Sequence, residues 1–221
     1  MSPRAAFRRH VATALLAAIA AAGCAALQSA PATRTFRLAY QPPTASPAPP
    51  LPAVVRVMPF GIAAAYNREV FIFRTGAYDV GIDYYDRWIT SPATMITDLV
   101  ARDLAASQTV RAVLQSPSAL PSDYELSAHI ETFEERDEKG ETCTAHLRMR
   151  VLLVRSSGEG RSVGMQQNFV GDEPCTRGDV ESYVAAMSRA TARTSTDIRN
   201  ALLDAIRRGD GSDGADAHIA K

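Results

Sequence analysis

Asp123–Phe133, with the sequence DYELSAHIETF, is the stretch that decides the fold, because its residues alternate between apolar and polar. Successive side chains of a β-strand point to opposite faces, so the alternation predicts a strand with one buried face and one polar face. The residues expected on the buried face are Tyr124, Leu126, Ala128 and Ile130. Those expected on the polar face are Glu125, Ser127, His129 and Glu131.

Two strand-like runs follow this stretch, and we expect them to form a hairpin. They span Thr142–Val154 and Arg161–Val170 and are joined by the turn sequence SSGEG. Folding the chain about this turn places Cys143 opposite roughly position 172 or 173, close to Cys175, because antiparallel partners are equidistant from the turn.

Two segments have the period of an amphipathic helix. The first begins at Ser91-Pro92, where serine is a favourable cap and proline suits the first helical position. Its apolar stripe consists of Met95, Ile96, Leu99, Val100 and Leu104. The second helix is long and runs from Asp179 to about Arg207, where the following Arg208-Gly209 favours an end. Residues 209–221 are small, polar and acidic, and are predicted to be disordered.

Shorter apolar runs predict the remaining strands. These runs are Val54–Met58, Val70–Phe73, Tyr78–Ile82 and Thr109–Leu114. Alternation within Thr35–Tyr40 predicts an edge strand that docks on the domain. Together the elements predict an α+β fold of two layers, in which a mixed, mostly antiparallel β-sheet packs against two amphipathic helices, the C-terminal one long.

The N-terminus has the pattern of a lipoprotein signal peptide. Three arginines precede an uncharged apolar run, Val11–Ala22, which is too short to span a bilayer and leads through Gly23 to Cys24. We predict that residues 1–23 are cleaved and that Cys24 carries a diacylglycerol group and an N-acyl chain, which together anchor a protein far more firmly than one chain. The alternative is an ordinary signal peptide followed by a chance cysteine.

Residues 24–52 are interpreted as the lipid anchor and a proline-rich tether. Gln41–Pro52 is half proline and is expected to behave as an extended spacer. The domain itself is predicted at residues 53–208.

Cleavage changes both the charge and the cysteine count of the chain. It removes three arginines and no acidic residue, so the formal net charge falls from 0 to −3. Such a chain offers no basic patch for nucleic acid. It also leaves Cys143 and Cys175 as an even pair in an oxidising compartment, where we expect a disulfide worth about 3 kcal/mol. Two free buried thiols are the alternative.

The sequence contains no pattern that supports an enzyme or a bound cofactor. Folding the hairpin onto the first strand brings His129, His146 and Glu131 to one face, but three ligands at best make a weak zinc site. A solvated face with charge pairs is the preferred interpretation. A cluster of acidic residues is interpreted as a solvated, exposed turn. Acid–base catalysis by paired carboxyl groups needs a pocket that shifts the pKa of one group away from that of the other, and an exposed turn offers no such pocket. The members of the cluster are Glu131, Glu134, Glu135, Asp137, Glu138 and Glu141. The triplet RGD occurs at 177–179 and 208–210 and is interpreted as helix-boundary chemistry.

Arg87-Trp88 has two interpretations. The single tryptophan is either a packing residue of the core or of a helix entry, or an aromatic anchor that contacts a protein partner together with Arg87.

The order of these motifs resembles the ABC-type transport auxiliary lipoproteins. The resemblance is carried by the signal peptide with its cysteine, the proline-rich tether, the segment AYNREVFIFR at 65–74 and the Arg87-Trp88 step into a helix. The strand that contains Tyr124 and the long C-terminal helix complete it, so that it covers roughly residues 35–206. The proline often found in the family near Asn67-Arg68-Glu69 is missing here.

The resemblance implies a non-catalytic partner of an MCE-type lipid transport system, which includes an MCE-domain protein and an ABC permease and ATPase. It also implies an outer-membrane location, with Ala25 after the cysteine in agreement, and in some members a ring-shaped homo-oligomer. Two alternatives remain open: a carrier that binds lipid in a groove between the sheet and the long helix, and a purely structural envelope lipoprotein.

Overall fold

The computed structural model of the protein describes residues 32–137, 140–157 and 160–216, and its sheet is organised around β7 (Tyr124–Asp137). One edge of β7 pairs antiparallel with β8 (Thr142–Ser157). The other edge pairs in parallel with three shorter strands in succession. These are β2 (Leu51–Val57), β3 (Gly61–Ile62) and β4 (Val70–Arg74).

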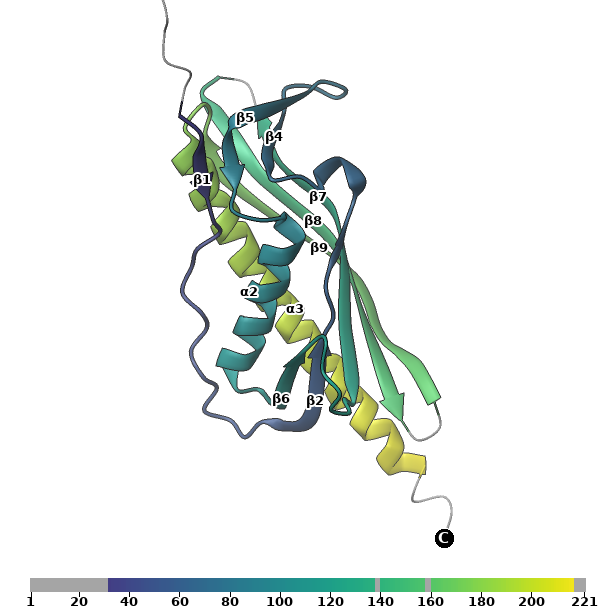
Figure 1. The fold of residues 1–221 in the computed structure, drawn as a ribbon. Coiled ribbons are helices and arrows are strands. Elements are labelled where there is room, and N and C mark those ends of the chain that lie inside the picture. Colours follow the sequence, from purple (N-terminus) through teal and green to yellow (C-terminus); the bar gives the residue numbers. More distant parts are fainter. Residues whose placement is uncertain (1–31, 138–139, 158–159, 217–221) are drawn as a thin grey trace, which may run out of the picture. The chain divides into compact units, whose positions relative to one another are not determined.

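The other strands extend the sheet from these partners (Figure 1). They are β9 (Gly160–Thr176), antiparallel to β8; β5 (Val80–Trp88), antiparallel to β4; β1 (Arg34–Phe36), parallel to β5; and β6 (Val110–Gln115), parallel to β2. A short 3-10 helix, η1 (Ala64–Tyr66), follows β3. The sheet is mixed and its longest pairings are antiparallel, which confirms the predicted α+β class.

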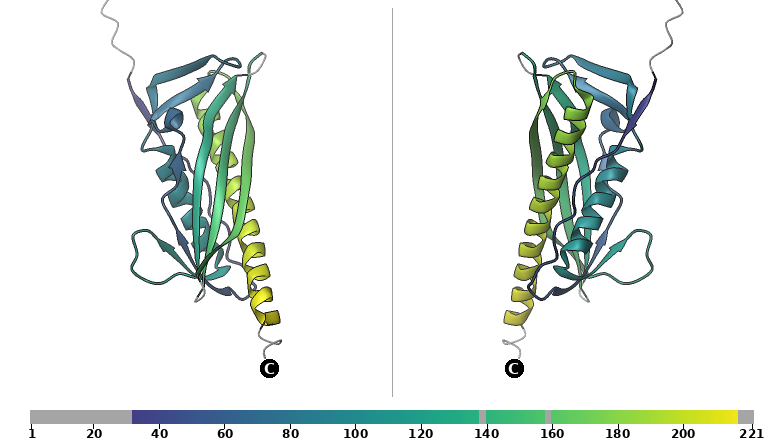
Figure 2. Two further views of the ribbon diagram at one scale, coloured as in Figure 1. Left: turned by 90° about the vertical axis from the view of Figure 1, so that its right-hand side faces the viewer. Right: turned by 90° about the vertical axis from the view of Figure 1, so that its left-hand side faces the viewer.

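Helices α2 (Pro92–Ser107) and α3 (Val180–Asp216) pack on one face of the sheet, where α3 follows β8 and β9 and α2 lies beside α3 (Figure 1; Figure 2). Asp179 caps α3 as predicted, since its carboxylate accepts a hydrogen bond from the Ser182 amide. The predicted end at Arg208-Gly209 is wrong, because α3 continues to Asp216. The added segment 209–216, which was predicted to be disordered, contains three glycines, and each costs a helix only about 1 kcal/mol. Residues 217–221 lie outside the described part of the chain.

The core lies between the sheet and the two helices. The predicted buried face of β7 is confirmed, because all four of its apolar residues are less than a tenth exposed. A register irregularity between Ile130 and Thr132 then shifts the alternation and buries Phe133. Fully buried side chains of β8 and α3 fill the space opposite, among them Leu147, Met149, Val151, Leu153, Met187, Ile198 and Leu202.

The N-terminal segment lies along the domain: the docked edge strand expected within Thr35–Tyr40 is found as β1, and the predicted domain start at residue 53 is wrong. β1 pairs with β5, and Leu38 is buried. The Tyr40 hydroxyl donates a 2.7 Å hydrogen bond to Asp103 of α2, and the Leu51 amide donates to the Thr109 carbonyl. The proline-rich segment is thus attached to the domain by apolar and polar contacts, and the domain begins near Arg34.

Gly171 of β9 lets α3 approach the sheet closely. A Cβ atom at this position would lie 2.7 Å from the Thr194 hydroxyl and 2.9 Å from the Ala190 carbonyl, both on α3. A real Cβ atom does not tolerate such distances, and the backbone of a packed helix yields little.

We therefore predict that Gly171→Ala lowers the free energy of unfolding by about 1–3 kcal/mol, the usual cost of overpacking. Urea denaturation of the variant and the parent measures the difference. The matched control is Gly164→Ala on the same strand, where the nearest atom would lie at an ordinary 3.5 Å. Equal losses in both variants would contradict the close-approach argument.

Candidate functional site

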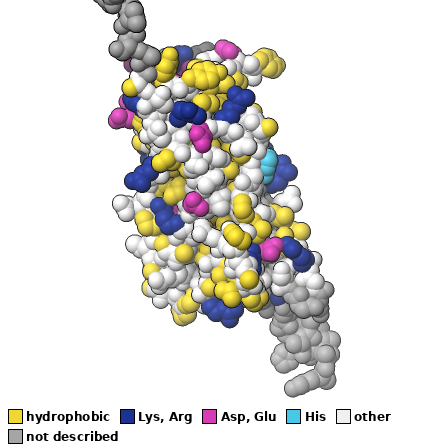
Figure 3. All heavy atoms as spheres, in the orientation of Figure 1, with side chains coloured by type: hydrophobic (Ala, Val, Ile, Leu, Met, Phe, Trp, Pro, Cys, Tyr) yellow, Lys and Arg dark blue, Asp and Glu magenta, His cyan; other side chains and the backbone are white. Residues whose placement is uncertain are grey.

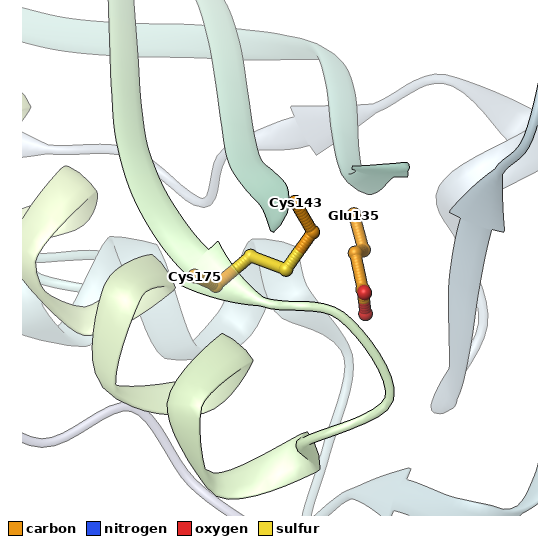
Figure 4. Close-up of side chains that lie close together, drawn as sticks. All are labelled: Glu135, Cys143 and Cys175. Carbon is orange, nitrogen blue, oxygen red and sulfur yellow. A yellow bond between two sulfur atoms is a disulfide. The ribbon is translucent and has the colours of Figure 1, made fainter. Parts of the chain in front are cut away.

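Cys143 of β8 and Cys175 of β9 lie directly opposite one another and are joined by a disulfide (Figure 4). Their Cα atoms are 4.9 Å apart and both residues are buried. Simple folding of the hairpin predicts that position 172 or 173 lies opposite Cys143, which differs by about two residues from the actual partner, Cys175. A register irregularity between Leu153 and Val154 accounts for part of this offset.

Glu135 of β7 lies beside this disulfide, and its carboxylate is within 4.8 Å of both sulfur atoms (Figure 4). The spacing would suit a metal ion if the sulfurs were thiolates, since the thiolate is the metal ligand. In the disulfide the sulfurs are bonded to each other, so no metal site is formed by this group.

Glu135 also lines a cavity of about 360 Å³ at the end of the domain where β4, β5 and β7 meet the start of α3. The cavity holds two ion pairs, Arg34 with Asp86 at 2.7 Å and Arg177 with Asp137 at 3.2 Å. Burial, together with the negative charge of Asp137, raises the pKa of Glu135 to about 7. This carboxyl therefore exchanges a proton near neutral pH, and the charge of the cavity depends on pH.

The acidic cluster does not form the solvated turn that the sequence suggests. Glu134 is buried, accepts a 2.6 Å hydrogen bond from the Tyr66 hydroxyl and pairs with Arg74 and Arg136, each at 2.9 Å. Burial alone would raise its pKa, but these donors and charges outweigh burial and hold the pKa below its ordinary value. The reason for the difference is that β4 pairs with β7 and covers its far end. Glu138 lies outside the described residues.

The structure separates the two histidines considered for a metal site. His129 lies opposite Arg150, whereas His146 lies opposite Glu134. His146 is buried and contacts Asp172 at 2.5 Å, and burial lowers the pKa of its imidazole. Glu131 pairs instead with Arg148 and Arg150, as a charge pair on the polar face of the sheet.

Trp88 belongs to the core, so its interpretation as a contact for a protein partner is wrong. It is 2 % exposed and packs against three aromatic rings of β4, β7 and α3. The ring centroids of Phe71, Phe133 and Tyr183 lie 4.3, 5.3 and 6.0 Å from it. Arg87 points the other way, pairs with Glu69 at 3.5 Å and lines an open hollow of about 470 Å³ with Tyr84.

The tyrosines of β5 are surface features that the sequence did not single out. Neighbouring residues of a regular strand point to opposite faces, so one of Tyr84 and Tyr85 should be buried. Both are exposed, by 70 % and 50 %, because a β-bulge interrupts the pairing of β5 with β4 here. A bulge inside a strand leaves little signal in the sequence.

The family is decided by a match to a family model over residues 36–199, described as the ABC-type transport auxiliary lipoprotein component. The chain belongs to this family. Membership of a lipoprotein family implies association with the cell envelope, and the description names an auxiliary component of a transporter. The match begins within β1, so the auxiliary lipoprotein domain includes the docked N-terminal segment.

Solved structures show the same fold. A crystal structure of a Xanthomonas campestris protein assigned to DUF330 superposes with a TM-score of 0.71 at 19 % identity, covering 80 % of this chain and 99 % of its own. The crystal structure of an uncharacterized protein gives a TM-score of 0.60 at 12 % identity, covering 77 % of this chain and 99 % of its own. No curated protein matches the auxiliary lipoprotein. No helix among the described residues is long and apolar enough to cross a membrane.

The raised pKa of Glu135 predicts a pH-dependent stability. Between about pH 4.5 and pH 7 the folded protein keeps a proton that the unfolded chain has released, so stability falls as the pH rises through this window. Glu135→Gln has no such proton to lose. Above pH 7 we expect the variant to be more stable than the parent by about 1–2 kcal/mol after allowance for solvent screening, with no gain at pH 4.5.

Thermal unfolding at a series of pH values measures this difference. Glu131→Gln is the matched control, because the guanidinium of Arg150 lowers the pKa of that carboxylate and its removal brings no gain at high pH. If Glu135→Gln followed the pH profile of the parent, the assigned pKa shift would be wrong.

Proposed function

We propose that the protein is a lipid-anchored, non-catalytic adaptor of an MCE-type lipid transport system. Cys24, with its diacylglycerol and N-acyl chains, holds it in the outer membrane, and the folded domain contacts the MCE-domain protein that works with the ABC permease and ATPase. The family match over residues 36–199 carries this proposal. The small residues before Cys24 and the neutral Ala25 after it support the anchor and its location.

The packing of the core supports an adaptor over a lipid carrier. A carrier needs a largely apolar cavity in which most of a ligand's surface is buried. Here the space between the sheet and α3 is occupied by side chains with no exposed surface, such as Met149 and Met187. The cavities around Glu135 and Arg87 are lined by charged residues and do not suit an acyl chain.

Crosslinked cell envelopes test the adaptor role. With the full-length protein as bait, we expect co-purification of an MCE-domain protein and of the permease and ATPase. Cys24→Ala is the matched variant: it should lose radiolabelled lipid, remain unprocessed or soluble, and recover fewer partners. Repeated failure of the parent to recover an MCE protein would overturn the docking role. Normal processing and membrane attachment of the variant would overturn the anchor.

We further propose that copies of the protein associate along β9. Among the strands that the structure describes, β9 pairs only with β8, which leaves a long edge with main-chain donors and acceptors facing outward. Natural proteins usually shorten such edges or protect them with charges. The central part of this edge, 162–170, carries no charged residue, and Val163 and Val170 are exposed by 65 % and 48 %.

The double variant Val163→Lys/Val170→Lys should therefore remain folded but shift to monomer, because like charges then meet across the paired edges. Native mass spectrometry of the detergent-solubilised protein measures the oligomeric state. Leu120→Lys, which also places lysine at an exposed apolar site, should leave the parent's state unchanged. A monomeric parent, or identical assemblies in all three proteins, would contradict self-association through β9.

A further inference from the structure

Exposed apolar and aromatic side chains gather on β5 and on the turn that precedes it. We name the β5 surface as the following residues, with their exposed fractions: Tyr78 100 %, Val80 54 %, Tyr84 70 %, Tyr85 50 % and Ile89 61 %. All five come from one short segment. In the space-filling view hydrophobic side chains lie at the end of the domain formed by β4 and β5, with arginines beside them (Figure 3).

The fold holds these side chains outward. The Asp83 carboxylate accepts hydrogen bonds from the amides of Tyr85 and Asp86, at 2.8 and 3.2 Å, and so fixes the bulge that exposes both tyrosines. The preceding turn is closed by Thr75, whose hydroxyl and amide donate to Asp79 at 2.6 and 3.1 Å. Tyr78 therefore lies at the tip of a braced hairpin.

β1 begins at the end of the domain that carries this hairpin (Figure 1). It is parallel to the last residues of β5, with Arg34 opposite Asp86 and Phe36 opposite Trp88. The Arg34 guanidinium holds this pairing through two hydrogen bonds to Asp86, at 2.7 and 2.9 Å.

The remaining linker is short enough for the tip to reach a membrane. Nine residues lie between Cys24 and Arg34, which makes ten steps from one Cα atom to the next. Fully extended they reach about 35 Å, and a random-coil chain of that length averages about 18 Å. The distance from Asp86 to Val80 along β5 is itself about 20 Å. A linker of average length is therefore compatible with contact between the hairpin tip and the membrane.

We propose that the tip of the β5 surface, Tyr78 and Val80, contacts the phospholipid bilayer in which Cys24 is anchored, an inference that rests on the anchor of the proposed function. Tyrosine is favoured at the membrane–water interface, because its ring is apolar and its hydroxyl forms hydrogen bonds with water. The tip segment 75–82 contains no arginine or lysine. The contact is therefore apolar and interfacial, and it does not depend on anionic lipid or on low salt.

Fluorescence quenching tests this contact in the lipidated protein. The protein is reconstituted into vesicles of phosphatidylethanolamine and phosphatidylglycerol that contain a phospholipid brominated on its acyl chains. In Tyr78→Trp the added tryptophan emission should shift to shorter wavelength and lose intensity relative to vesicles without bromine, at low and at high salt. The native Trp88 is buried in the core and provides the constant background that the unsubstituted protein measures.

Leu120→Trp is the matched control. Leu120 is also exposed, and it precedes β7, whereas β4 pairs with the opposite end of that strand, roughly 35 Å away at the usual rise per residue. Its emission should not respond to the bromine. No quenching at position 78, or equal quenching at both positions, would overturn the membrane contact. So would protection of position 78 that appears only when an MCE-domain protein is added.

Mass spectrometry of the N-terminal peptide separates this proposal from the anchor. If Cys24 carries its acyl chains and position 78 is not quenched, the membrane contact is wrong and the anchor stands. If Cys24 carries no acyl chain, the anchor itself is wrong, and the inference that rests on it falls with it.

Discussion

The pairing of both edges of β7 is the constraint on which the rest of the structure depends. Buried main-chain groups must find hydrogen-bond partners. β7 lies inside the sheet, so most of the main-chain groups on both of its edges need a partner strand. β8 covers one edge along its length, and β2, β3 and β4 cover the other in turn. The chain from Leu51 to Arg74 must therefore run beside β7, which places α2 next to α3 and carries the β4–β5 hairpin to the far end of the domain.

A second, polar constraint joins the N-terminal segment to both helices. Asp103 of α2 is 4 % exposed, and one of its oxygens accepts hydrogen bonds from Tyr40 and from Ser195 of α3, each at 2.7 Å. Its other oxygen contacts Arg102 at 2.7 Å. Removing any one partner would leave a buried charge less well satisfied, so the three segments are held as a set. The docked segment is thus part of the domain, which is why the linker to Cys24 is short.

Local sequence patterns predicted the helices and strands. Pairing between segments distant in sequence decided which of their side chains are exposed. The alternation around Leu126 and the helical period after Asp179 sufficed for the α+β class, and antiparallel folding of one hairpin brought Cys143 near Cys175. The parallel pairings of β1, β2 and β4 join distant segments, and nothing local marks them. For this reason the sequence left the role of Trp88 open between core packing and partner contact, and it misplaced Glu134; both are covered by such partners. The irregularity of β5 leaves residues 84–86 without a partner on β4, so the exposure of Tyr84 and Tyr85 also escaped prediction.

The parallel arrangement of β1 and β5 has a mechanical consequence. A force that pulls Cys24 and the rest of the domain apart enters at Arg34 and acts along the axis of β1, in the plane of the sheet. Its hydrogen bonds to β5 and the Arg34–Asp86 ion pair are then loaded together in shear, whereas a perpendicular pull would break them one at a time. In the proposed anchored adaptor, the short strand is therefore the element that resists such a pull.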